Sequence, residues 1–112
     1  LTTAQDTDPP QISQVKTESS LITGKEDKVQ SVIFWKTEES STSQVRFEEG
    51  IKASDSFSQE SNEDDNLTTN HIIVITNLSP GTVYHFTVVS KDAAGNEAVS
   101  ENSTLLTPQK NQ

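Results

Sequence analysis

The chain carries few residues that could catalyse a reaction or hold a metal ion. Its histidines are His71 and His85, and it contains no cysteine. A transition-metal site needs several such ligands at matched spacing, and neither histidine belongs to such a pattern. The sequence also lacks the Gly-x-Ser-x-Gly turn that presents a nucleophilic serine, and Gly95 has no neighbouring glycines to form a phosphate-binding loop. We therefore expect a protein without catalytic residues or a cofactor, in which both histidines are ordinary strand residues.

One acidic cluster offers oxygen ligands of the kind that calcium prefers. Glu63, Asp64 and Asp65 follow one another, with Asn62 before them and Asn66 after them. Carboxylate and amide oxygens bind Ca²⁺, but a calcium loop alternates its acidic residues and contains a glycine, and this segment does neither. The other interpretation is a solvated loop whose like charges repel one another, and the sequence favours it.

The composition of the chain excludes several classes of protein. A length of 112 residues corresponds to one domain. With 17 Asp and Glu against 8 Lys and Arg, the net charge is -9, which argues against nucleic acid as a partner because that contact needs clustered positive charge. No apolar stretch approaches the roughly 20 residues that cross a bilayer, so we expect no membrane insertion. The absence of cysteine excludes a disulfide framework.

The apolar residues gather in short runs of Val, Ile and Phe that polar turns separate, which is typical of an all-β domain. We expect a linker or tail over 1–10, a domain over 11–108 and a tail over 109–112. The turn spacing of 8–12 residues predicts an antiparallel β-sandwich, with a long surface connection over Ala53–Asn70 that contains at most one short strand. The expected strands are Ile12–Thr17, Val29–Lys36, Gln44–Glu48, His71–Thr76, Val83–Ser90 and a last one over Ala98–Thr107.

Three segments resemble a known family. Leu78–Tyr84, with its Pro-Gly turn, is similar to the leucine-to-tyrosine corner of a fibronectin type III domain, and Asp92–Asn96 is similar to a hairpin loop of bacterial copies. The stretch Trp35–Val45 resembles the variant related to the N-terminal domain of purple acid phosphatases. The resemblance covers about Pro9 to Pro108 and implies an immunoglobulin-like sandwich of about seven strands in a secreted, multi-domain protein. It implies no metal ligands here, since those of the phosphatases belong to a separate domain.

Strand alternation predicts the interior of this sandwich. Successive side chains of a strand point to opposite faces, so Trp35 and Ile33 share one face of their strand. Tyr84 is expected to fill the core edge, while its hydroxyl bonds to the backbone of the preceding turn. We expect a structural core of Trp35, Tyr84, Leu78, Phe47 and Phe86, together with Ile33, Val45, Ile73, Ile75 and Val88.

The same alternation predicts an apolar patch on the outside. If the interior assignment holds, Val32, Phe34, Ile72 and Val74 point outward, and their two strands are neighbours in a sandwich of this type. Cross-strand pairing that only stabilises the sheet would explain the patch, and so would a partner surface. The outer face of the other sheet instead presents the polar residues Arg46, His85 and Thr87.

These observations leave three classes of function open. The first is a non-catalytic module of a larger extracellular or cell-surface protein, acting as a spacer, an adhesive unit or a protein-interaction domain. The second is a self-assembling filament or surface-layer subunit that associates through the patch. The third is an accessory domain of a secreted hydrolase that contacts polysaccharide, although Phe34 is the only aromatic residue expected outside. The expected partners are neighbouring domains or other protein chains, including copies of this chain.

Overall fold

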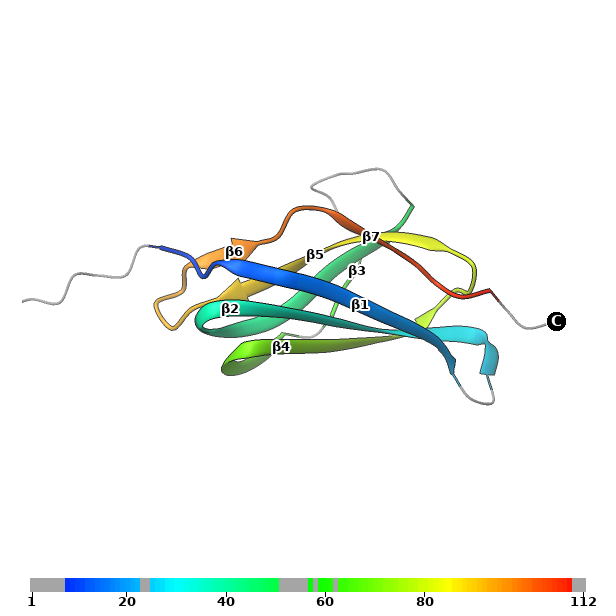
Figure 1. The fold of residues 1–112 in the computed structure, drawn as a ribbon, viewed down its shortest axis with the longest axis horizontal. Helices are drawn as coiled ribbons and strands as arrows, with labels where there is room; N and C mark the ends of the chain where they lie inside the picture. Colours follow the sequence, from blue (N-terminus) through cyan, green and yellow to red (C-terminus); the bar gives the residue numbers. More distant parts are fainter. Residues whose placement is uncertain (1–7, 23–24, 51–56, 58, 62, 110–112) are drawn as a thin grey trace, which may run out of the picture.

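The computed structural model describes residues 8–22, 25–50, 57, 59–61 and 63–109, and within them the chain is built of strands alone (Figure 1). The described residues contain no helix that is long and apolar enough to cross a membrane. The strands are β1 (Ile12–Ile22), β2 (Lys25–Glu49), β3 (Gln59–Glu60), β4 (Asp64–Leu78), β5 (Val83–Lys91), β6 (Glu97–Val99) and β7 (Ser103–Leu106).

All strand pairs are antiparallel, and they form the two layers of a β-sandwich. The first sheet has the order β1-β2-β4, and in the second sheet β2 pairs with β3 and β5, while β5 also pairs with β6 and β7. The chain turns back within β2 and so contributes to both sheets (Figure 1). The predicted all-β class and antiparallel sandwich are confirmed.

The strand β2 contains two of the predicted strands and the polar turn between them. Its first part pairs with β1 up to Thr37 and with β4 up to Lys36, and its second part pairs with β5 from Gln44 onward. The backbone between them stays extended because the pairing with β4 continues through Ser41 and Ser43. The direction change therefore falls where the sequence predicts a turn, without ending the strand.

The predicted connection over Ala53–Asn70 is partly strand, and residues 51–56, 58 and 62 within it lie outside the described residues. Ser61 ties the described part to β2, because its amide donates to the Val45 carbonyl at 2.8 Å and its hydroxyl accepts from the Val45 amide at 2.9 Å. The strand β4 then begins at Asp64, so the expectation of a loop at Asp64 and Asp65 is wrong.

The core lies between the sheets and contains the side chains that alternation predicts. All ten are buried, and none is more exposed than the 8% of Ile73. The Trp35 indole Nε1 donates to the Ser90 hydroxyl of β5 at 2.9 Å, which joins the two sheets. The Tyr84 hydroxyl accepts from the Ser79 amide at 2.9 Å, as the Pro-Gly turn predicts. The turn and the core edge are thus held by one side chain.

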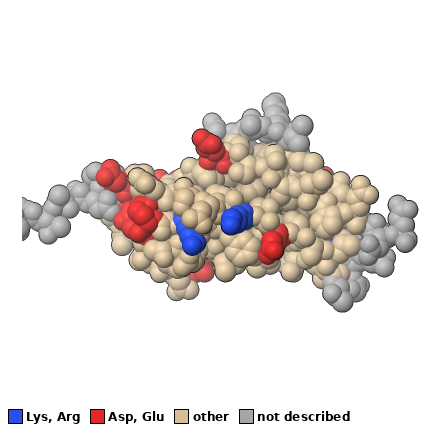
Figure 2. Space-filling view, in the orientation of Figure 1, with Lys and Arg blue, Asp and Glu red and all other residues tan. Residues whose placement is uncertain are grey.

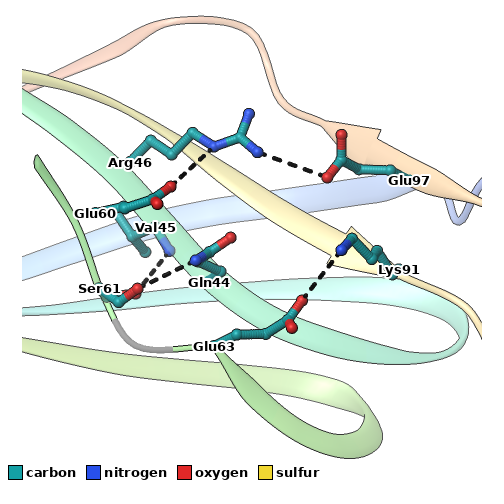
Figure 3. Close-up of polar contacts among 8 residues, drawn as sticks. All are labelled: Gln44, Val45, Arg46, Glu60, Ser61, Glu63, Lys91 and Glu97. Atoms are coloured by element: carbon teal, nitrogen blue, oxygen red, sulfur yellow. Dashed lines mark hydrogen bonds and ion pairs between the residues drawn. The ribbon is translucent and has the colours of Figure 1, made fainter. Parts of the chain in front are cut away.

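The outer face of the second sheet differs from the expectation of an exposed polar surface. His85 and Thr87 point outward from β5, yet both are buried. Arg46 of β2 forms ion pairs with Glu60 of β3 at 3.5 Å and Glu97 of β6 at 3.6 Å, so its side chain crosses over β5 (Figure 3). The Phe57 ring also packs on His85, with centroids 5.1 Å apart. This face is therefore covered by the chain itself.

Candidate protein-interaction site

The four residues of the predicted apolar patch lie together on the outer face of the first sheet. They form two directly opposite cross-strand pairs, Val32 with Val74 and Phe34 with Ile72. Ile72 and Val74 are 56% and 53% exposed, whereas Val32 and Phe34 are half-buried. Opposite pairs have Cβ atoms roughly 5 Å apart, so the four side chains form one continuous apolar surface. We call this surface the patch.

A shallow hollow of about 340 Å³ lies at one end of the patch. Phe34 and Ile72 form part of its lining, and the amide side chains of Gln14 and Asn70 border it. The β1 backbone bulges beside it, where the register shifts between Ser13 and Lys16 and Gln14 has a φ of 54°. Bulges re-aim side chains at sheet edges, and this bulge brings Gln14 to the hollow.

Two lysines border the hollow, one on each side of Phe34. Lys16 is the β1 residue opposite Phe34, and Lys36 follows Phe34 by two positions on β2, so all three share the outer face. Both lysines are exposed, and neither forms an ion pair with another described residue. Figure 2 shows basic side chains near the middle of the face over β1 and β2, with acidic ones around them.

The cationic side chains Arg46 and Lys91 of the second sheet, in contrast, form ion pairs within the chain. Arg46 is held by two carboxylates, and the Lys91 ammonium lies 3.7 Å from the Glu63 carboxylate (Figure 3). Both cations thus neutralise acidic residues of the chain's own surface. On the first sheet, Lys16 and Lys36 share the outer face with two exposed glutamates, Glu18 two positions after Lys16 on β1 and Glu38 two positions after Lys36 on β2. Lys16 and Lys36 therefore give the hollow a basic rim, with one acidic residue further along each of the two strands.

Comparison of the chain with protein-family models, curated proteins and solved structures finds no match. The residues around the hollow carry ammonium, amide, aromatic and aliphatic groups, and Trp35 and His71, whose side chains are buried on the inner face, also contribute to its lining. Such groups bind a ligand by contact and charge, and they offer no nucleophile beside a base. Lys36 could have been found from the sequence, because it alternates with Phe34. Lys16 could not, because its place depends on the bulge.

His71 lies on the opposite, inner face, where hydroxyl groups bond both nitrogens of its ring. Thr37 donates to the Glu39 carbonyl at 2.7 Å, so its oxygen accepts from His71 Nε2 at 2.8 Å. The Ser43 hydroxyl then donates to Nδ1 at 2.7 Å. Burial lowers the pKa of His71 from its ordinary 6.5, and the nearby Asp64 carboxylate opposes this in part. His71 is thus a neutral, bonded residue of the core.

His85 has a separate environment on the second sheet. Its Nδ1 lies 3.0 Å from the Gly50 carbonyl, and its Nε2 lies 3.6 Å from the Glu48 carboxylate. The two histidines therefore contact different groups on opposite sheets. Among the described residues, no three His, Cys, Asp or Glu side chains come together in a way that could hold a metal ion.

The carboxylates of the acidic cluster, Glu63, Asp64 and Asp65, have separate surroundings in the structure. Glu63 pairs with Lys91, and Asp64 accepts the Asn66 amide on its Oδ1 at 3.0 Å. Asp65 is exposed and next to Asp64 in β4, where successive side chains point to opposite faces. The three carboxylates therefore do not converge on one point, as calcium coordination would require.

We expect calcium to leave the thermal stability of the chain unchanged. A ligand that binds only the folded state raises the melting temperature, and dispersed carboxylates bind too weakly to do so. Addition of about 1 mM CaCl2 should shift the melting temperature by less than about 1 °C in calorimetry. The matched control is the double variant Asp64→Asn, Asp65→Asn. A rise of several degrees that this variant loses would contradict the expectation.

Proposed function

We propose that the chain is a non-catalytic module of a larger extracellular or cell-surface protein, and that it binds a neighbouring domain or another protein chain through the patch. The exposure of Ile72 and Val74 carries this proposal. The turn at 78–84, held by Tyr84, supports the likeness to fibronectin type III domains, which serve as spacers, adhesive units and interaction domains. A secreted location follows from that likeness.

Cross-strand pairing explains the patch only in part. Ile72 pairs directly with Phe34, and Val74 with Val32, yet each remains more than half exposed. Burying apolar surface contributes about 25 cal/mol per Å², so a partner that covered the patch would be stabilised by it. The second sheet shows the contrast, because Arg46 and Phe57 cover its outer face. Among the described residues no comparable segment covers the first sheet.

Self-assembly is the second candidate, and the position of β4 favours it. This strand pairs only with β2 among the described strands, so one edge of β4 is available beside Ile72 and Val74. A second copy could extend the sheet there, as exposed edge strands do. The net charge of -9 opposes such contact at low ionic strength. Association of copies through the patch should therefore strengthen as salt screens the repulsion.

A sedimentation velocity series tests the self-assembling form of the proposal. The wild type should associate increasingly between about 20 mM and about 500 mM NaCl if copies meet through the patch. The double variant Phe34→Ser, Ile72→Thr should remain monomeric at every salt concentration, because it removes one complete cross-strand pair. The control is Val99→Ser, Leu106→Thr, which changes two exposed apolar residues elsewhere, 48% and 67% exposed.

The outcome separates the two candidates. A wild type that stays monomeric throughout refutes self-assembly and leaves the partner-binding form, which a peptide titration tests. Association that is equal in the wild type and the patch variant shows that another surface is used. If no apolar peptide distinguishes the wild type from the patch variant either, the proposed function is refuted.

A further inference from the structure

We infer that the patch binds a short segment of another protein in which an apolar side chain is flanked by carboxylates. The apolar side chain would occupy the hollow beside Phe34, and the carboxylates would pair with Lys16 and Lys36. This inference rests on the proposed function and adds the chemistry of the partner. Three observations carry it: the size of the hollow, its lining and the charge at its rim.

The size and lining of the hollow fit an apolar side chain together with the backbone that carries it. Its volume of about 340 Å³ lies at the small end of the range of about 300–1,000 Å³ for ligand sites. Phe34 and Ile72 form its apolar surface, and this surface continues along the strands to Val32 and Val74. An extended segment laid along the strands would therefore contact apolar surface beyond the hollow as well. Gln14 and Asn70 at the border can both donate and accept hydrogen bonds with its backbone.

The charge at the rim favours carboxylates in the partner. Lys16 and Lys36 approach the hollow from β1 and β2, so the two ammonium groups border Phe34 from two sides. In a chain of net charge -9, these exposed cations form no ion pair with a described residue. Complementary charge selects partners and suppresses wrong ones. A carboxylate on each side of the inserted apolar side chain matches this arrangement.

Two other occupants fit these observations less well. An acidic polysaccharide supplies carboxylates, but sugar rings pack on exposed aromatic platforms, and Phe34 is half-buried and borders an aliphatic side chain, Ile72. A second copy would bring another nine negative charges toward Glu18 and the acidic surface around it. A short acidic segment of a different protein avoids the first difficulty and reduces the second, because it brings fewer negative charges and places them at Lys16 and Lys36.

Fluorescence anisotropy with a panel of labelled peptides tests the inference. The first peptide has a leucine between aspartates and glutamates, the second replaces the acidic residues with glutamines, and the third replaces the leucine with glycine. Only the first should bind the wild type measurably, and its affinity should fall at least about fivefold between about 20 mM and about 500 mM NaCl. Polygalacturonate is added as an unlabelled competitor to represent an acidic polysaccharide.

Substitutions in the chain test whether Lys16, Lys36 and the patch are responsible for peptide binding. Lys16→Gln and Lys36→Gln should each weaken binding about two- to fivefold, as exposed ion pairs do. The matched control is Lys28→Gln, which removes the same charge from β2 at a distance of roughly 26 Å from Lys36 along the strand and should bind as the wild type does. The variant Phe34→Ser, Ile72→Thr should lose binding, and circular dichroism confirms that each variant is folded.

The possible results separate this inference from the function on which it rests. If the glutamine peptide binds as tightly as the acidic one and only the patch variant loses it, the charged partner is refuted while the patch remains an interaction surface. Equal binding to the wild type and Lys16→Gln refutes the charged partner in the same way. If polygalacturonate displaces the peptide and binds more tightly, the site is a polysaccharide site and the inference is overturned. Binding of no peptide also overturns it.

Discussion

Replacing Trp35 with alanine should lower the free energy of unfolding by about 3–5 kcal/mol, a large part of the about 5–15 kcal/mol that stabilises a typical domain. The side chain is 1% exposed, and its ring stacks on His71 with centroids 5.0 Å apart and an interplanar angle of 8°. Its Nε1 also donates to Ser90 in the second sheet. The truncation would therefore leave a cavity between the sheets and remove a bond across it.

Urea unfolding measures this effect. Trp35 is the only tryptophan, so the variant has to be followed by far-ultraviolet circular dichroism instead of tryptophan fluorescence. The control is Trp35→Phe, which keeps an aromatic ring against His71 but loses the N–H group that Ser90 accepts. We expect it to cost about 1–2 kcal/mol. A loss below about 1 kcal/mol in the alanine variant would show that Trp35 is not central to the core.

Lowering the pH below 6.5 should destabilise the chain through His71. Protonation puts a second hydrogen on the ring, at Nδ1, where the Ser43 hydroxyl now donates. That hydroxyl would have to reverse, and the charge would be buried beside Thr37 and Trp35, with Asp64 as the one acidic group known to favour it. Because burial lowers the pKa of His71 in the folded state, the unfolded chain takes up the proton first.

The direction of this change in stability follows from the difference between the pKa of His71 in the folded and in the unfolded chain. The stability contributed by neutral His71 is complete above the unfolded pKa of 6.5 and is lost as the pH falls toward the lower folded pKa. In that window the slope has the sign of a stability that rises with pH, and its upper limit for one proton is about 1.4 kcal/mol per pH unit. Urea unfolding between about pH 5 and about pH 8 measures it while most carboxylates stay ionised.

The control for the pH effect is His71→Gln, whose amide can bond to hydroxyls but does not titrate. This variant should be less stable than the wild type at pH 7 by about 1–3 kcal/mol, since its bonds to Thr37 and Ser43 are less well placed. Its stability should depend less on pH in the same window, with His85 present in both proteins. Equal slopes would assign the dependence to other groups.

Strand alternation was enough to predict which side chains form the core and which form the patch. A shift of either strand by one residue would exchange its inner and outer faces. In the run from Val32 to Trp35, and again from Ile72 to Ile75, every side chain is apolar, and only the pairing of the two strands decides which face each occupies. The burial of Trp35 fixes this choice, since the largest side chain needs the interior. The adjacency of Phe34 and Ile72 then follows from the pairing of β2 with β4.

The remainder of the site could not be predicted, because it depends on elements with weak local patterns. The exposed residues of β1 are all polar, and the sequence of such an edge strand specifies its register only weakly. Its bulge at Gln14 places Lys16 opposite Phe34, and no turn residue marks that bulge in the sequence. In the same way, Arg46 covers β5 only because Glu60 and Glu97 come from segments distant in the chain.

The passage of β2 from one sheet to the other has a consequence for how the domain comes apart. This strand is hydrogen-bonded to β1 and β4 in one layer and to β3 and β5 in the other. Peeling either layer away would strip bonds from a segment that the other layer still holds, so partial opening gains little chain entropy. We therefore expect paired amide hydrogens in both parts of β2 to exchange with solvent through the same global unfolding. For the same reason, we expect the domain to unfold as one unit when its ends are pulled apart.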